Sequence, residues 1–175
     1  VCVLGHLREV KDPFRAAQAS RLLPPTSRIR VTQIGGALGE EYEKWALGES
    51  SSNPRYSWLG EHPRWKAIRL MARSRLLVLT SVLEGGANAV SEALACSVPV
   101  LSSRISGSIG LLGEDYHGYF SVGNTSELAD LMSKAETDSD FYESLNRACE
   151  ERSGLIDPER ERDSWRQLLS EVVAR

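Results

Sequence analysis

Short apolar runs alternate along the chain with longer segments in which apolar residues recur at helical spacing. Such runs, bounded by turn residues, are typical of strands buried on both faces of a parallel sheet. They predict six strands, over residues 1–4, 29–34, 56–60, 76–79, 98–101 and 119–122.

The segments between and after these runs predict helices. Asp12 as N-cap and Pro13 at the first helical position open one helix, which Pro24-Pro25 stops. A capping pattern at residues 124–127 opens another. Further helices are expected over residues 40–48, from Pro63 to Met71, across the segment ending at Ala95, over 139–151 and from Asp157-Pro158 onward. The glycine-bearing residues 106–113 are expected to form a loop.

This alternation predicts an α/β fold, a Rossmann-like doubly wound parallel sheet with helices on both faces. One domain is expected to span residues 1–175. Such sheets bind ligands beyond the carboxyl ends of their strands. Gly5, Gly35-Gly36, residues 84–88 and residues 106–113 all follow strands, so we expect them to meet in one crevice.

Residues 79–95 are the most informative stretch, since they predict a strand end, a glycine-bearing turn and an amphipathic helix. Backbone N–H groups at a helix N-terminus favour an anion such as a phosphate. Glu84 and Glu92 flank this turn with seven residues between them. A nucleotide sugar needs donors for its diphosphate and acceptors for its hydroxyls, and this stretch supplies both. Alternatively, Glu92 lies on a solvated helix face.

Four other residues are candidates for the same crevice. Lys11 sits in the loop after the first strand and could neutralise a departing diphosphate, or it is a surface lysine. His6 and Arg8 share that loop, where each either lines the site or has a structural or surface role. Gly36 either permits close ligand approach or makes a tight turn.

Composition narrows the classes of function. The formal net charge of −3 gives no basic footprint for nucleic acid, and no apolar run approaches a membrane span. The three cysteines lack metal-ligand spacing, so we expect reduced, mostly buried thiols in a cytoplasmic protein.

Dinucleotide-binding, P-loop and serine-hydrolase motifs are missing from the sequence. A receiver-like domain would need an aspartate cluster that the chain lacks. Because an apolar strand, without methionine, begins the chain, we expect a domain of a longer protein.

Two motifs carry a resemblance to a known family. Glu84 and Glu92, followed by Ala93-Leu94-Ala95-Cys96-Ser97-Val98-Pro99-Val100, resemble the signature of retaining GT-B glycosyltransferases of the glycogen-synthase-like group. Gly5-His6-Leu7 with Lys11 is similar to the Gly-Arg-Leu…Lys element of their C-terminal, donor-binding domain. His6 departs from the family's arginine, and Gly86-Ala87-Asn88 departs from its common Phe-Gly pair.

The resemblance implies a role for each matching residue. Lys11 would contact the donor diphosphate, Glu84 the sugar, and Glu92 the ribose. Backbone amides at Gly86, Ala87, Asn88 and Ala89, next to Gly85, would meet sugar and phosphate oxygens. The resemblance implies neither a metal nor another cofactor. It also implies a partner for this chain, the enzyme's own N-terminal domain.

Three segments resemble a narrower group, the selenosugar synthases of selenoneine biosynthesis: Gly5 to Arg15, Glu84 to Asn88 and Gly107 to Tyr116. That resemblance implies transfer of the sugar of UDP-N-acetylglucosamine or UDP-glucose to selenophosphate, with release of UDP. Two alternatives remain open. One is an ordinary retaining transferase with a hydroxyl acceptor, and the other is a nucleotide-sugar-binding module without catalysis.

Overall fold

A six-stranded parallel sheet forms the centre of the computed structural model, which describes residues 1–173. The strands lie in the order β3-β2-β1-β4-β5-β6, and every neighbouring pair is parallel. Their bounds are β1 Cys2–Leu4, β2 Val31–Ile34, β3 Tyr56–Trp58, β4 Leu77–Leu79, β5 Val100–Ser103 and β6 Tyr119–Phe120. The predicted doubly wound α/β fold is therefore confirmed, with its switch point between β1 and β4.

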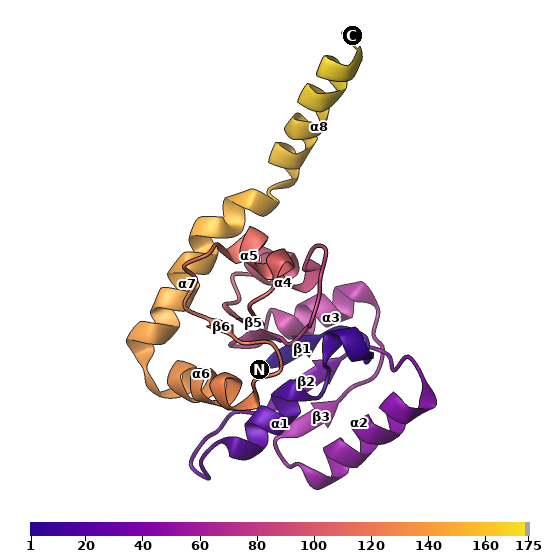
Figure 1. The fold of residues 1–175 in the computed structure, drawn as a ribbon, viewed down its shortest axis with the longest axis vertical. Coiled ribbons are helices and arrows are strands. Elements are labelled where there is room, and N and C mark those ends of the chain that lie inside the picture. Colours follow the sequence, from indigo (N-terminus) through magenta and orange to yellow (C-terminus); the bar gives the residue numbers. More distant parts are fainter. Residues whose placement is uncertain (174–175) are drawn as a thin grey trace.

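Helices cover both faces of this sheet. Helices α1, α2 and α6 lie on one side, and α3, α4 and α5 on the other (Figure 1). The α-helices are α1 Arg15–Leu22, α2 Glu40–Ser52, α3 Arg64–Met71, α4 Asn88–Ala95, α5 Ser106–Leu112, α6 Thr125–Thr137, α7 Ser139–Ser153 and α8 Pro158–Val173. Two 3-10 turns, η1 Glu9–Lys11 and η2 Gly154–Ile156, complete the described elements. Right-handed crossovers between parallel strands produce this division of the helices.

The core explains why the central turn is held in place. Strand β4 is buried along its whole length, and the helix that follows it, α4, buries Val90, Ala93 and Leu94. Burying a valine or leucine side chain contributes about 1.5–3 kcal/mol. The turn that joins β4 to α4 is therefore fixed at both ends by packed elements.

The predicted loop at residues 106–113 is wrong, because most of it forms helix α5. Leu112 is buried on the inner side of this helix. Gly107 is required by a neighbour distant in sequence, since a Cβ there would lie 2.6 Å from the Glu84 carbonyl oxygen. Gly113, at φ +88°, ends the helix. Two of the three glycines thus serve close approach and helix termination, which composition alone does not distinguish from a flexible loop.

The predicted start of the first helix is also wrong. Asp12 does not cap it; helix α1 begins at Arg15 and its N-cap is Phe14. Asp12 instead ends η1 in the left-handed region, at φ +43°. Its carboxylate accepts a hydrogen bond from Arg15 Nε at 2.7 Å. The Asp-Pro pair therefore marks a turn between η1 and α1.

Other elements are present with shifted ends. The strand expected over 98–101 is β5, Val100–Ser103, and the helix expected over 40–48 continues to Ser52 as α2. Helix α8 extends away from the sheet (Figure 1), with Trp165, Leu168 and Leu169 about half exposed. Within the described part of the chain, no helix combines the length and apolar character needed to cross a bilayer.

The burial of the cysteine thiols gives a first test of the fold. All three are free thiols; Cys2 and Cys149 are buried, and Cys96 is partly exposed. Burial raises the pKa of the Cys2 thiol to about 12 and also raises that of Cys149. Because the thiolate is the reactive form, we expect iodoacetamide at pH 8 to modify no thiol of the native protein except Cys96. Mass spectrometry should count three modified thiols after denaturation, and rapid native labelling of Cys2 would contradict the fold.

Candidate functional site

Two glycines let the loops after β1 and β2 pack directly together. A Cβ on Gly35 would lie 2.1 Å from the carbonyl oxygen of Gly5, and Gly35 has φ +145°. The Gly5 N–H donates to the Ile34 carbonyl at 2.9 Å, which continues the strand pairing into the loops. The Leu7 N–H donates to Gly36 in the same way, at 2.9 Å. The carboxyl edge of the sheet is thus built from closely packed backbone.

The loop after β1 is also tied to the turn after β4. Thr80 Oγ1 donates to the carbonyl oxygens of Lys11 and Asp12, at 2.9 Å each. The Val82 N–H donates to the Val10 carbonyl at 2.9 Å. These bonds hold η1, and with it Lys11, beside the central turn.

Lys11 and Glu84 form an ion pair across this junction. Lys11 Nζ contacts Glu84 Oε1, and the same oxygen accepts a hydrogen bond from Ser81 Oγ at 2.7 Å. The side chains are 21% and 12% exposed, so both charges are largely shielded from water. The stem of Lys11 passes the Cα of Gly5. The structure therefore brings together the two residues that sequence reasoning placed at the reacting centre.

The turn after Glu84 offers unpaired donors. The N–H groups of Gly85, Gly86 and Ala87 have no acceptor among the residues that the structure describes. Asn88 opens α4, and no side chain caps that helix. Its neighbour Ala89 is half-buried in the first turn. Unpaired N–H groups at a helix N-terminus form an anion-binding environment.

Glu92 has the partner that its half-buried position requires. Its Oε1 accepts a hydrogen bond from Arg64 Nε at 2.9 Å, and Nη2 of the same guanidinium lies 2.9 Å from that oxygen in an ion pair. The Glu92 side chain is 19% exposed and that of Arg64 is 79% exposed. Both line a cavity of about 220 Å³ at the carboxyl edge, together with Gly5, His6 and Gly35.

The remaining candidates divide into two groups. His6 lines this cavity, and a Cβ on Gly36 would lie 3.4 Å from His6 Nδ1 and 3.2 Å from Glu61 Oε2. Gly36 itself does not line the cavity; it lies beside His6 and Glu61, which do. Arg8 is exposed, opens η1 as its N-cap, and lines none of the cavities at this edge. The structure gathers His6 with Glu92 in the cavity lining, leaves Gly36 beside His6 but out of that lining, and leaves Arg8 outside.

Sequence reasoning missed Arg64, Glu61 and His62, which also line the cavity. They follow β3, and their position after a strand was the available signal. It also missed Gln33, which is 1% exposed within β2. Gln33 Nε2 donates to the Gly5 carbonyl at 3.2 Å, whereas Oε1 has no partner among the described residues. A glutamine within an apolar run was the signal there.

Chemically, one edge of the sheet combines a lysine, unpaired backbone donors and two carboxylates. The donors and Lys11 suit a diphosphate, and the carboxylates Glu84 and Glu92 suit sugar and ribose hydroxyls. Among residues 1–173, no group of three or more histidine, cysteine, aspartate or glutamate side chains is arranged to hold a metal ion.

One protein family and several solved structures are similar to this chain. A family model described as glycosyl transferases group 1 matches residues 1–152. The structure resembles HepE from Anabaena in complex with UDP and glucose, with a TM-score of 0.78 and 21% identity. It also resembles the HepE complex with UDP-glucose, with a TM-score of 0.77 and 21% identity. Each alignment covers 98% of this chain and 48% of HepE.

A second relative shares the fold at lower identity. Sucrose-phosphate synthase from Thermosynechococcus elongatus gives a TM-score of 0.78 at 17% identity, over 98% of this chain and 45% of the synthase. The chain therefore spans about half the length of these solved relatives. No curated protein sequence matches it.

The close contact at Gly35 can be tested by substitution. Gly35→Ala places a Cβ against the Gly5 carbonyl at a backbone angle that alanine rarely adopts. We expect the free energy of unfolding to fall by about 2 kcal/mol or more. Gly48→Ala is the matched control, because a Cβ at this position in α2 meets nothing within 4 Å. Urea unfolding should show the control unchanged or more stable; equal stability of both variants would contradict the packing.

Proposed function

Because the chain belongs to the glycosyl transferases group 1 family, we propose that it is the donor-binding domain of a retaining glycosyltransferase with a UDP-sugar donor. The observation that carries this proposal is the junction of Lys11, Glu84 and the unpaired amides of residues 85–87 at one sheet edge. The likeness to HepE, which was crystallised with UDP and with UDP-glucose, supports uridine as the nucleotide.

The diphosphate is assigned to the turn before α4. Its oxygens would accept hydrogen bonds from the N–H groups of residues 85–87, where the helix dipole favours negative charge. Lys11 lies beside this turn. On donor binding, its ammonium would leave the ion pair with Glu84 and bind the diphosphate instead. As the bond between the sugar and UDP breaks, negative charge grows on the departing diphosphate, and the Lys11 ammonium stabilises it.

Once Lys11 engages phosphate, Glu84 becomes an acceptor for sugar hydroxyls. Ser81 Oγ continues to hold its carboxylate at the mouth of the turn. Glu92 is assigned to the ribose diol, since it lies one helical turn further into α4 and lines the adjacent cavity. Arg64 holds the Glu92 carboxylate in position for that contact.

We propose that the complete enzyme contains a second domain, which binds the acceptor. The solved relatives are about twice as long as this chain, in agreement with that arrangement. A catalytic site built between two domains needs both of them. The isolated chain should therefore bind donor with little or no turnover.

For the acceptor we propose selenophosphate. The three segments that resemble selenosugar synthases lie next to one another: the loop holding Lys11 contacts Glu84, and Glu84 contacts Gly107 of α5. In the proposed reaction, selenium forms a bond to the anomeric carbon. The bond from that carbon to the UDP oxygen breaks, and UDP leaves with the electron pair.

Donor binding is tested by calorimetric titration of UDP into the chain and its variants. Glu92→Gln and Lys11→Met each remove one charge-assisted contact, so the Kd for UDP should rise about 10- to 100-fold. Glu114→Gln and Lys44→Met are matched controls, because each residue forms an exposed ion pair elsewhere. GDP and ADP should bind more weakly than UDP. Equal UDP affinity in all four variants would refute the assignment.

The acceptor is tested on the complete enzyme that contains this chain. With UDP-N-acetylglucosamine or UDP-glucose and selenophosphate, mass spectrometry should detect a selenium-containing sugar together with free UDP. The isolated chain serves as the inactive control. Transfer to a hydroxyl acceptor with selenophosphate ignored would establish an ordinary glycosyltransferase and overturn the selenium assignment, while leaving the donor site intact.

A further inference from the structure

Gln33, within β2, buries a carbonyl oxygen that receives no hydrogen bond from any residue of the described chain. The residue is 1% exposed, and its Nε2 donates to the Gly5 carbonyl at 3.2 Å. That bond fixes the orientation of the amide, because the reverse orientation would set two carbonyl oxygens against each other. Oε1 is therefore the atom without a partner. Since buried polar atoms in proteins nearly always have one, this oxygen requires an explanation.

A second buried amide, that of Asn53, shows what a purely structural role requires. Asn53 is 2% exposed, and its Nδ2 donates to the Ala17 carbonyl at 3.1 Å and to Glu49 Oε1 at 2.8 Å. Its Oδ1 accepts from the Arg55 N–H at 3.0 Å. Both ends of the Asn53 amide are bonded, whereas Gln33 has one bonded end. Burying an unpartnered oxygen destabilises a fold, so packing alone does not account for Gln33.

A cavity of about 10 Å³ lies beside Gln33, beneath the loop that follows β1. The polar side chains in its lining are those of Gln33, Lys11, Thr80 and Ser81. A cavity of this volume holds about one water when two or more polar groups face it. The unpartnered oxygen and the lysine of the candidate site thus share one water-sized space.

Lys11 has the hydrogen-bond donors that such a water needs. An ammonium carries three N–H donors, and among the described residues only Glu84 accepts from this one. A water in the cavity would accept from Lys11 Nζ and donate to Gln33 Oε1. Its second hydrogen would meet Thr80 Oγ1, which donates its own proton to backbone carbonyls and keeps its lone pairs free.

We propose that Gln33 is a positioning residue for Lys11, and that it acts through one ordered water in this cavity. The inference rests on the proposed donor site, in which the ammonium leaves Glu84 for the diphosphate. During that exchange the water held by Gln33 remains a partner of the ammonium and keeps it beside the turn after β4. Gln33 itself does not line the cavity that contains Glu92.

The first test compares affinity for UDP with stability. Gln33→Met keeps the length of the side chain and removes both polar ends. It should raise the Kd for UDP about fivefold in calorimetric titrations, because the ammonium loses its water-mediated partner. The urea midpoint should not fall, since the variant also removes a buried oxygen without a partner. Gln18→Met, at an exposed position of α1, should change neither quantity.

Asn53→Leu is the buried control, because Asn53 lines neither cavity at the carboxyl edge. It should lower the urea midpoint and leave the Kd for UDP within about twofold of the wild type. If Gln33→Met instead behaved like Asn53→Leu, losing stability and keeping its affinity for UDP, Gln33 would have a structural role only and the proposal would fail.

A double-mutant cycle tests whether the effect passes through Lys11. When Lys11→Met is already present, adding Gln33→Met should change the Kd for UDP less than twofold, because the ammonium that it positions is gone. Additive losses would contradict a positioning role.

A crystal structure of the chain tests the water directly. It should show one water within hydrogen-bond distance of both Gln33 Oε1 and Lys11 Nζ, and the Gln33→Met crystal should lack it. A wild-type crystal without that water, or with Lys11 Nζ bonded directly to Gln33 Oε1, would overturn the proposal. The wild-type titration keeps this result separate from the proposed function, since failure to bind UDP removes the donor site whether or not the water is found.

Discussion

The ion pair between Lys11 and Glu84 joins the two loops on which the candidate site is built. Thr80 fixes the backbone on the lysine side, Ser81 holds the carboxylate on the other, and Gly107 lets α5 approach the same residue. Both charges are largely shielded, so losing either partner leaves the other poorly solvated. An anion that enters the turn must compete with Glu84 for the lysine. In the proposed donor site, this competition would couple diphosphate binding to the release of the Glu84 carboxylate as an acceptor for hydroxyls.

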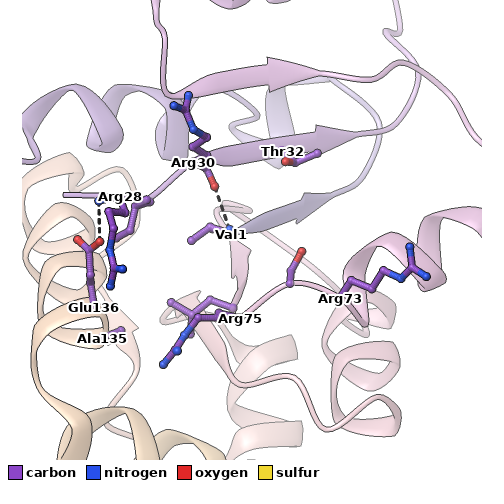
Figure 2. Close-up of a pocket in the computed structure, with 11 residues that line it drawn as sticks. Val1, Arg28, Arg30, Thr32, Arg73, Arg75, Ala135 and Glu136 are labelled. Carbon is purple, nitrogen blue, oxygen red and sulfur yellow. Dashed lines mark hydrogen bonds between the residues drawn. The ribbon is translucent and has the colours of Figure 1, made fainter.

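The two edges of the parallel sheet, at the carboxyl and the amino ends of its strands, carry different charged groups. At the carboxyl edge, unpaired amides and Lys11 lie beside the carboxylates Glu84 and Glu92, so charges of both signs are present. At the amino edge, four arginines and one carboxylate, Glu136, lie around Val1 (Figure 2). The first arrangement suits a ligand with both phosphates and hydroxyls.

Much of this could be predicted from sequence, where the signal was local. Buried runs such as the one at residues 76–79 identified the strands, and their order along the chain identified the parallel sheet. The position of Glu84 and Glu92 around a glycine turn predicted the candidate donor site, and the structure brings Glu84 into contact with Lys11 there. The failures depend on contacts between distant residues. Helix α5 needs Gly107 against Glu84, and Arg64 belongs to the candidate site only because its guanidinium reaches Glu92 of α4. The turn at Asp12 depends on η1, which the Thr80 hydroxyl and the Val82 backbone N–H hold.

The most direct test of the donor site is to map UDP binding by NMR on isotopically labelled protein, which at 19.3 kDa is within the range of the method. The account predicts that the amide signals of Gly85, Gly86 and Ala87 shift on titration, together with those of the Gly5–His6 loop and Glu92. Signals near Arg28 and Arg73, at the far edge of the sheet, should stay unchanged. Shifts confined to that far edge, or the absence of any shift at residues 85–87, would contradict the assignment of the diphosphate to this turn.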